Sequence, residues 1–263
     1  MTAPRRDTPT PRLPFLARAE MFVRLLMIQS AYNYELLLGN GVAYCVEPAL
    51  RRLPGGPDGD AYRDALARES QYFNAHPYLA AVAVGALARA ELEGAQPARI
   101  ERFRTALCGP LGSVGDRLVW AGWLPFCSLL ALAAYGLGAS PLVVLLLFLV
   151  LYNAGHLGLR AWGLAVAWRH GLRVASPLAT PVLRDGPAHL ARAAALVAGI
   201  ALPLALHRAI GPGRALLGGV VLVVAVMGAL AARLPQRLQG WRLALGVLAI
   251  WIAWSIARHT VTR

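Results

Sequence analysis

Hydrophobic and polar positions are distributed unevenly along this chain, with amphipathic segments in the first half and long apolar runs in the second. Over residues 20–38 apolar side chains recur at helical spacing. The Gly39-Asn40-Gly41 run that follows predicts the end of this helix, because glycine readily adopts the left-handed conformation found after helices. A second short helix is expected over residues 42–53, and the Pro- and Gly-rich residues 54–59 predict a loop.

The next segments alternate between charged and apolar character. Residues 60–73 read as a solvated helix, whereas residues 78–90 are small and apolar. About thirteen residues are too few to cross roughly 30 Å of hydrocarbon as one helix, so a buried or re-entrant segment is expected. Three glycines and one proline fall within residues 109–116. Because these residues disfavour a regular helix, a turn or helix break is predicted there.

The apolar runs of the second half predict about five transmembrane helices. They cover residues 118–138, 141–168, 188–206, 215–232 and 243–257. The fold class is therefore an all-α, polytopic membrane protein, whose amphipathic or re-entrant N-terminal helices precede about five transmembrane helices. The expected regions are a flexible cytoplasmic tail over residues 1–20, an amphipathic and re-entrant region over residues 21–117, and a transmembrane region over residues 118–263.

Composition supports a membrane protein. Hydrophobic residues make up 57% of the chain, charged residues only 15%, and the mean hydropathy is +0.52; soluble domains carry about 25% charged residues. The net charge is +13, and all 26 basic residues are arginines scattered at the ends of apolar segments. This placement favours lipid headgroup contacts over a nucleic-acid-binding face. The N-terminal residues lack an apolar core, so a cleaved secretory signal is not expected and the N-terminus is placed in the cytoplasm.

Three polar clusters interrupt this apolar sequence, at residues 29–35, 72–77 and 109–116. Amides and acids in a bilayer need a partner, a cavity or a ligand. On the expected helix, Gln29 and Asn33 are four residues apart and share a face, while Glu35 projects elsewhere. Two interpretations of these amides stay open. They are either interhelical hydrogen bonds worth about 0.6–2 kcal/mol each or direct contacts to a polar ligand, which neutral amides recognise without burying net charge.

The other polar residues indicate no catalytic constellation. The sequence has no phosphate-binding glycine loop and no nucleophile elbow. Cys45, Cys108 and Cys127 lack metal-ligand spacing and are expected to be small buried residues. His76 and His156 are expected to be structural. Two roles stay open for Asp116. It forms a structural ion pair with Arg117 or Arg160, or it has a functional role. No catalytic residue, cofactor or metal is therefore predicted.

An ordered series of motifs carries a family resemblance. The series runs Phe22-Val23-Arg24, Gln29 with Asn33-Tyr34-Glu35, Pro48-Ala49-Leu50-Arg51-Arg52-Leu53, Phe73-Asn74 with Pro77, Gly109-Pro110-Leu111 with Gly115-Asp116, and Tyr152-Asn153 with Arg160 and Gly163. In this order the motifs resemble the IID subunit of the mannose/fructose/sorbose family of the bacterial sugar phosphotransferase system. The resemblance covers about residues 22–173.

This resemblance implies a subunit that forms the sugar-translocating unit with a membrane IIC subunit, assembled as trimers of IIC–IID pairs. In that family IIA and IIB carry phosphate on histidine and phosphorylate the sugar, here a mannose-type hexose, during uptake. The IID chain itself is not phosphorylated. The implied location is the bacterial inner membrane, as a multi-pass protein in contact with lipid.

The candidate site residues follow from the motifs and from the chemistry of amides. The expected substrate-binding residues are Asn74, Asn33 and Gln29. The expected gating or structural residues are Asp116, Gly109, Gly112, Gly115, Pro77, Glu35 and Arg160. The glycines of this set are expected to form a hinge that lets one block of the complex move against another, as in transporters with interrupted helices.

Departures from the family pattern define the alternative. Arg117 follows Asp116 where the family usually has a small residue or proline, and Trp123-Leu124-Pro125 replaces a usual Arg-Pro pair. Gly211-Pro212-Gly213 makes a short turn where the family has a long insertion. The alternative function is a transport-inactive membrane scaffold or regulatory subunit derived from this family. An independent membrane enzyme is the weakest candidate, because no catalytic constellation is present.

Overall fold

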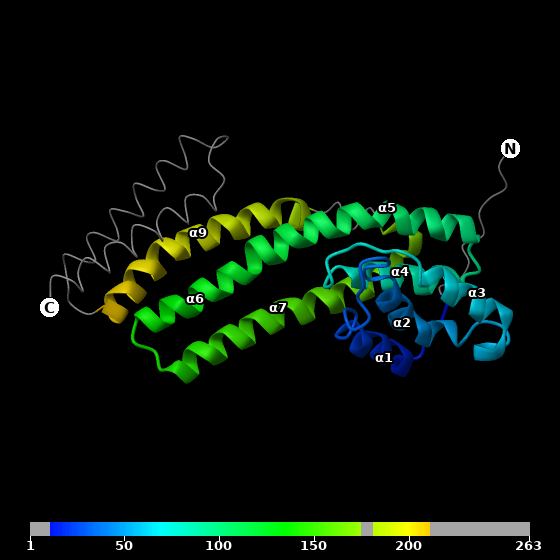
Figure 1. The fold of residues 1–263 in the computed structure, drawn as a ribbon, viewed down its shortest axis with the longest axis horizontal. Helices are drawn as coiled ribbons and strands as arrows, with labels where there is room; N and C mark the ends of the chain where they lie inside the picture. Colours follow the sequence, from blue (N-terminus) through cyan, green and yellow to red (C-terminus); the bar gives the residue numbers. More distant parts are fainter. Residues whose placement is uncertain (1–10, 175–180, 211–263) are drawn as a thin grey trace.

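The computed structural model describes residues 11–174 and 181–210 (Figure 1). Within these ranges the elements are helices, accompanied by two isolated β-bridges. The expected spans over residues 215–232 and 243–257, the first ten residues of the expected tail and the turn at residues 211–213 lie outside the described residues. The expected all-α class is confirmed by this architecture.

Four short helices form the N-terminal part. They are α1 (Phe15–Leu25), α2 (Gly39–Leu50), α3 (Asp60–Glu69) and α4 (Ala80–Leu92), with a 3-10 turn over Gly56–Asp58. Helix α1 thus begins inside the residues expected as a tail. The expected helix over residues 42–53 and the loop over residues 54–59 are present, shifted by a few residues.

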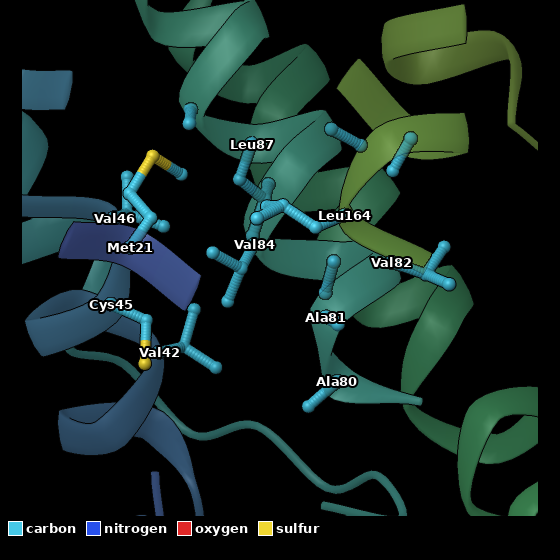
Figure 2. Close-up of a cluster of buried hydrophobic side chains, with 14 of the residues drawn as sticks. Met21, Val42, Cys45, Val46, Ala80, Ala81, Val82, Val84, Leu87 and Leu164 are labelled. Atoms are coloured by element: carbon cyan, nitrogen blue, oxygen red, sulfur yellow. The ribbon is translucent and has the colours of Figure 1, made fainter. Parts of the chain in front are cut away.

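Helix α4 is the centre of this part, and every residue from Ala80 to Glu91 is buried. Figure 2 shows its side chains between those of α1 and α2 on one side and those of α7 (Pro141–His170) on the other. Its small residues allow this close packing. A Cβ added to Gly85 would lie 2.6 Å from the carbonyl oxygen of Leu164. The expectation of a buried segment over residues 78–90 is therefore confirmed.

The expected helix over residues 20–38 is wrong. Helix α1 ends at Leu25, residues 26–38 form a series of turns, and Gly39-Asn40-Gly41 begins α2 instead of ending a helix. The glycines are needed for close approach, because a Cβ on Gly41 would lie 2.9 Å from the carbonyl carbon of Ile28. The left-handed residue is Leu37, at φ 51°. Gln29 and Asn33 consequently share no helical face.

Within residues 11–174 and 181–210, three long helices are apolar enough to cross a membrane. They cover Pro97–Gly136, Pro141–Arg173 and Leu183–Ala209. The first is made of α5 (Pro97–Gly115), a π-helix η2 (Asp116–Trp123) and α6 (Leu124–Gly136), and the third lies within α9 (Pro181–Ile210). Figure 1 shows them running along the long axis of the molecule, with the N-terminal helices gathered toward one end. These helices include the spans expected over residues 141–168 and 188–206, and all but the last two residues of the span expected over residues 118–138.

The predicted break at residues 109–116 is wrong. Helix α5 continues through Pro110 to Gly115, and the irregular turns begin only at Asp116. Pro110 is exposed, and so is Ala106, whose carbonyl loses its helical partner because proline has no N–H. Water or a neighbouring group can reach that carbonyl, so the helix tolerates the proline. Pro125 is the second residue of α6 and follows the π-helix without a break, so its missing N–H falls where the helix changes from π to α geometry.

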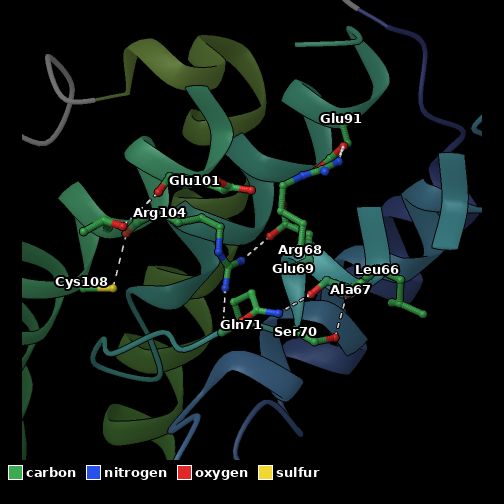
Figure 3. A network of polar contacts seen from close by, with 11 residues as sticks. Leu66, Ala67, Arg68, Glu69, Ser70, Gln71, Glu91, Glu101, Arg104 and Cys108 are labelled. Atoms are coloured by element: carbon green, nitrogen blue, oxygen red, sulfur yellow. Dashed lines mark hydrogen bonds and ion pairs between the residues drawn. The ribbon is translucent and has the colours of Figure 1, made fainter. Parts of the chain in front are cut away.

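A buried ionic network joins α3 to α4 and α5 (Figure 3). The Arg104 guanidinium pairs with the Glu69 carboxylate and donates to the Gln71 carbonyl at 2.8 Å, while Arg68 pairs with Glu91 at 2.8 Å. Burial and the nearby Glu91 carboxylate raise the pKa of Glu69, against the opposing effect of Arg104. Helix α3 is thus solvated on one side only and is fixed to the core by its last residues.

Candidate functional site

The fold brings the three polar clusters of the sequence together. Leu37 forms a parallel bridge with Phe73, in which the Leu38 amide donates to the Phe73 carbonyl at 3.0 Å and the Phe73 amide donates to the Leu36 carbonyl at 3.1 Å. Three residues later, the His76 amide donates to the carbonyl of Leu111 in α5 at 3.4 Å. Residues 29–35, 72–77 and 109–116 are therefore neighbours, although they are far apart in sequence.

The predicted substrate-binding amides lie on non-helical segments at this junction. Gln29 and Asn74 are exposed, and Asn33 is half-buried. The Asn33 Oδ1 atom accepts from the backbone amides of Glu35 at 3.0 Å and Leu36 at 2.8 Å. Its oxygen is thus occupied in shaping the turn, and only its side-chain NH₂ group remains to meet a ligand.

Arg160 lies beside the same junction and is only 3% exposed. Its Nε atom donates to the carbonyl of Leu25, the last residue of α1, at 3.2 Å, and its guanidinium lies 4.2 Å from the centre of the Tyr78 ring. A second guanidinium nitrogen is 2.8 Å from Nδ1 of His156. Arg160 therefore connects the start of the first polar turn to α7.

The donor and the acceptor of each hydrogen bond from Arg160 through His156 to Asn153 can be assigned. Because arginine only donates, His156 Nδ1 must accept, so its Nε2 carries the proton. That nitrogen donates to Asn153 Oδ1 at 2.9 Å, and the Asn153 amide donates to the Leu149 carbonyl at 2.6 Å. The Tyr152 hydroxyl, on the same helix, lies 2.7 Å from the Tyr78 hydroxyl. His156 is thus a neutral structural link.

A cavity of about 170 Å³ opens next to the hydrogen-bonded side chains of Arg160, His156 and Asn153. It is lined by Tyr78, Leu118, Val119, Trp123, Gly155, His156, Leu159 and Leu190. The indole of Trp123 packs directly on Gly155, and its N–H is buried without a hydrogen-bond partner among the described residues. The predominantly apolar lining suits hydrocarbon better than a sugar, whose hydroxyls need polar partners.

His76 is buried between the second polar cluster and α5. Its ring accepts a hydrogen bond from the Tyr78 amide at 3.2 Å, and its Cβ touches the backbone of Gly115. Burial, assisted by the positive charge of Arg160, lowers the pKa of His76 to about 4. The ring is therefore neutral at physiological pH and acts as a spacer between the two segments.

Acid is expected to destabilise the fold through His76. The folded pKa of about 4 lies below the unfolded value of about 6.5. Stability contributed by the neutral ring is therefore fully present above pH 6.5 and is lost as the pH falls from there through about 4. Melting temperatures of the wild type and His76→Gln, compared between pH 7.5 and 4, should diverge, with the wild type losing more. Parallel curves would contradict this role.

The remaining predicted site residues have separate environments. Asp116 is exposed and forms an ion pair with neither Arg117 nor Arg160, so the predicted pair is wrong; the Arg117 guanidinium instead donates to the Ser113 carbonyl at 3.2 Å. Glu35 is exposed, and Pro77 lies half-buried in the turn before α4. A Cβ on Gly109 or Gly112 would meet nothing within 4 Å, whereas one on Gly115 would meet His76.

The sequence did not predict the aromatic residues that pack around His76 and His156. Tyr78, Trp120 and Tyr152 surround the two histidines, with the Tyr78 and His156 rings stacked at 5.0 Å. A usable signal was the four-residue spacing of Tyr152, His156 and Arg160, which lines up three polar side chains on one face of α7. Of the cysteines, Cys45 and Cys127 are buried as expected, whereas Cys108 is half-buried.

Comparisons with known proteins agree with these observations. Residues 16–197 match the family described as PTS system mannose/fructose/sorbose family IID component. The fructose permease IID component of Bacillus subtilis (strain 168) is 32% identical over 166 residues, which cover 60% of this chain and 58% of the relative. The mannose-specific EIID component of Escherichia coli (strain K12) is 30% identical over 162 residues, covering 59% and 55%. The chain thus spans less than two thirds of the length of these relatives.

Solved structures show the same fold. A chain from the cryo-EM structure of the mannose transporter ManYZ with microcin E492 aligns with a TM-score of 0.56 and 22% identity, covering 94% of this chain and 97% of that chain. A second structure, described as a membrane protein, gives a TM-score of 0.69 at 22% identity, covering 94% and 98%. Because the family match extends over more than half of the sequence, the chain belongs to the mannose/fructose/sorbose family of phosphotransferase-system IID components.

Proposed function

We propose that this chain is the IID-type membrane subunit of a sugar phosphotransferase-system permease. With a IIC subunit it forms the translocation unit for a mannose-type hexose, which IIA and IIB partners phosphorylate during uptake. The pairs assemble as trimers in the bacterial inner membrane, and the N-terminus is cytoplasmic. Family membership and the three long apolar helices support this proposal.

One observation carries the proposal: the fold gathers three polar clusters of an otherwise apolar chain at one junction and leaves amides exposed there. Gln29 and Asn74 make no side-chain hydrogen bond to the described residues. A neutral amide both donates and accepts, so it can bind the hydroxyls of a sugar without burying net charge. Asn74 and Gln29 therefore contact the sugar or the gate that covers it, and Asn33 shapes the turn between them.

Asn74→Ala is expected to reduce sugar uptake by about fivefold while the protein remains abundant in the membrane, because a lost hydrogen bond to a hydroxyl costs about 1 kcal/mol. The measurement is uptake of labelled mannose in cells that express the chain with its IIC, IIA and IIB partners. Gln96→Ala is the matched control, because Gln96 is an equally exposed amide located before α5.

Equal losses of uptake and abundance would make Asn74 structural. Unchanged uptake would show that Asn74 at this junction does not contact the sugar during transport. If the wild-type complex is abundant, correctly assembled and still takes up no sugar, the scaffold alternative holds, and Arg117 and Trp123-Leu124-Pro125 are the first positions to revert to the family pattern.

A further inference from the structure

The turn from Asn33 to Leu37, here called the 33–37 loop, is held more firmly than its exposed position requires. The Asn33 side chain accepts from two amides of the loop, and the Leu37 amide donates to the Asn33 carbonyl at 2.9 Å. Leu37 then pairs with Phe73, a fully buried residue whose ring lies 5.4 Å from the Arg104 guanidinium carbon. The loop is therefore closed on itself and anchored to the core.

The backbone of the loop is also strained. Leu37 has a φ of 51° and is the non-glycine residue recorded with positive φ in the described ranges. This conformation is unfavourable for a bulky residue and persists only where the surrounding structure enforces it. Such strain is concentrated at ligand clamps and switch regions. A preorganised loop of this kind is typical of a recognition element.

The apex of the loop projects away from the chain. The Tyr34 side chain is 93% exposed, and its ring lies edge-on to the Tyr32 ring at 6.3 Å between centroids. Glu35 is exposed and has no ion-pair partner among residues 11–174 and 181–210. Sites for small molecules are concave, whereas Tyr34 is almost fully exposed and lines neither recorded pocket. Its shape therefore fits a pocket on another protein better than it fits a sugar.

The polar turns that lead to the loop start beside a membrane-crossing candidate. Arg160 binds the carbonyl of Leu25 and so fixes the start of the polar turns beside α7, one of the membrane-crossing candidates. Irregular backbone beside such a helix is stable only where protein covers it or water reaches it. A rigid tyrosine is a frequent anchor at protein interfaces, because it buries a large area at a small entropic cost.

We propose that the 33–37 loop docks into the partner membrane subunit, with Tyr34 inserted in a pocket and the Glu35 carboxylate accepting from an arginine, lysine or hydroxyl donor there. This inference rests on the proposed function, because it requires the IIC-type partner. It assigns to Asn33 the role of a positioning residue for Tyr34.

Tyr34→Ala is expected to weaken the complex with the co-expressed IIC-type subunit by about 30-fold, as for an interface anchor. The measurement is the dissociation constant of the two purified subunits in mild detergent, by fluorescence after labelling of one of them. Phe15→Ala is the matched control, because Phe15 is an aromatic residue, 74% exposed, at the far end of α1. Its complex should keep wild-type affinity.

Variants of Asn33 test whether the rigid shape of the 33–37 loop contributes to binding in addition to the direct contact of Tyr34. Asn33→Ala removes the oxygen that caps the loop and should weaken the complex about tenfold although Tyr34 is present, whereas Asn33→Asp keeps a capping oxygen and should bind within about threefold of wild type. Melting curves of each free variant test whether the chain still folds. For a variant that does not fold, a photoreactive phenylalanine analogue at position 34 should crosslink to the partner, and the same analogue at position 15 should not.

Two results would overturn the inference. The first is unchanged affinity of the Tyr34→Ala variant without a crosslink from position 34. The second is an intact complex whose KM for sugar is raised, which would make the loop a substrate contact. Failure of the proposed function is different, because then the wild-type chain would bind no IIC-type subunit at all and would purify as a stable monomer.

Discussion

Gly115→Ala is expected to destabilise the protein by about 1–3 kcal/mol and to abolish uptake, because its new methyl group would overlap His76. An ideal Cβ at this position would lie 2.6 Å from Cγ of His76 and closer still to its Cβ. Neither neighbour is the end of a flexible chain, so the second polar cluster must move away from α5. Denaturant unfolding of the purified chain and uptake in vesicles are the two measurements.

Gly112→Ala is the matched control, because Gly112 lies in the same helix and a Cβ there would meet nothing within 4 Å. It should be neutral or stabilise the helix by about 0.5–1 kcal/mol, since alanine loses less backbone entropy than glycine. If both variants lose transport equally while remaining stable, the hinge predicted from the sequence is correct. If only Gly115→Ala fails, the glycine is a packing position.

Replacement of Arg160 should loosen the link between the polar turns and α7. Arg160→Met leaves the Leu25 carbonyl and His156 Nδ1 without their donors, a loss of about 3 kcal/mol. Arg160→Lys should be nearly as damaging, because an ammonium lacks the planar fork that reaches both acceptors. Arg169→Lys, at an exposed position of the same helix, is the control.

Hydrogen exchange gives this prediction its specific readout. Amides of residues 26–31, which follow Leu25, should exchange at least tenfold faster in both Arg160 variants, while those of α4 stay protected. A uniform increase across the chain would indicate general destabilisation. Wild-type exchange in residues 26–31 would show that Arg160 does not hold the turns.

Long runs of apolar or small residues in the sequence correctly predicted helices α7 and α4. The apolar run over residues 141–168 became α7, and the small residues 78–90 became the buried helix α4, because length and side-chain size act locally. Glycine and proline gave wrong predictions where their role depends on distant neighbours. Gly41 is close to Ile28, and Gly115 is close to His76. Neither contact is visible in the spacing of residues along the chain.

The candidate site was predictable in part. The three polar clusters were identified as exceptional in an apolar chain, and the structure brings them together. Their assembly depends on the Leu37–Phe73 bridge and on the hydrogen bond from the His76 amide to the Leu111 carbonyl, which join residues far apart in sequence. The roles of single side chains were harder to predict from the sequence. Asn33 accepts hydrogen bonds from nearby backbone amides, and Asp116 pairs with neither arginine proposed for it.

The π-helix over Asp116–Trp123 also determines which sequence changes this membrane helix can accept. Each residue of an α-helix advances the chain by about 100° and 1.5 Å. The π-helix bonds residue i to residue i+5 and so holds about one residue more than an α-helix of the same rotation. Deleting one residue here would therefore let the wide turns relax to regular α-helix and would leave α6 close to its present rotational position, with Gly136 still against Leu204. The same deletion inside α6 would rotate every later residue of that helix by about 100°. Homologous chains should therefore accept a one-residue deletion within the π-helix more readily than within α6.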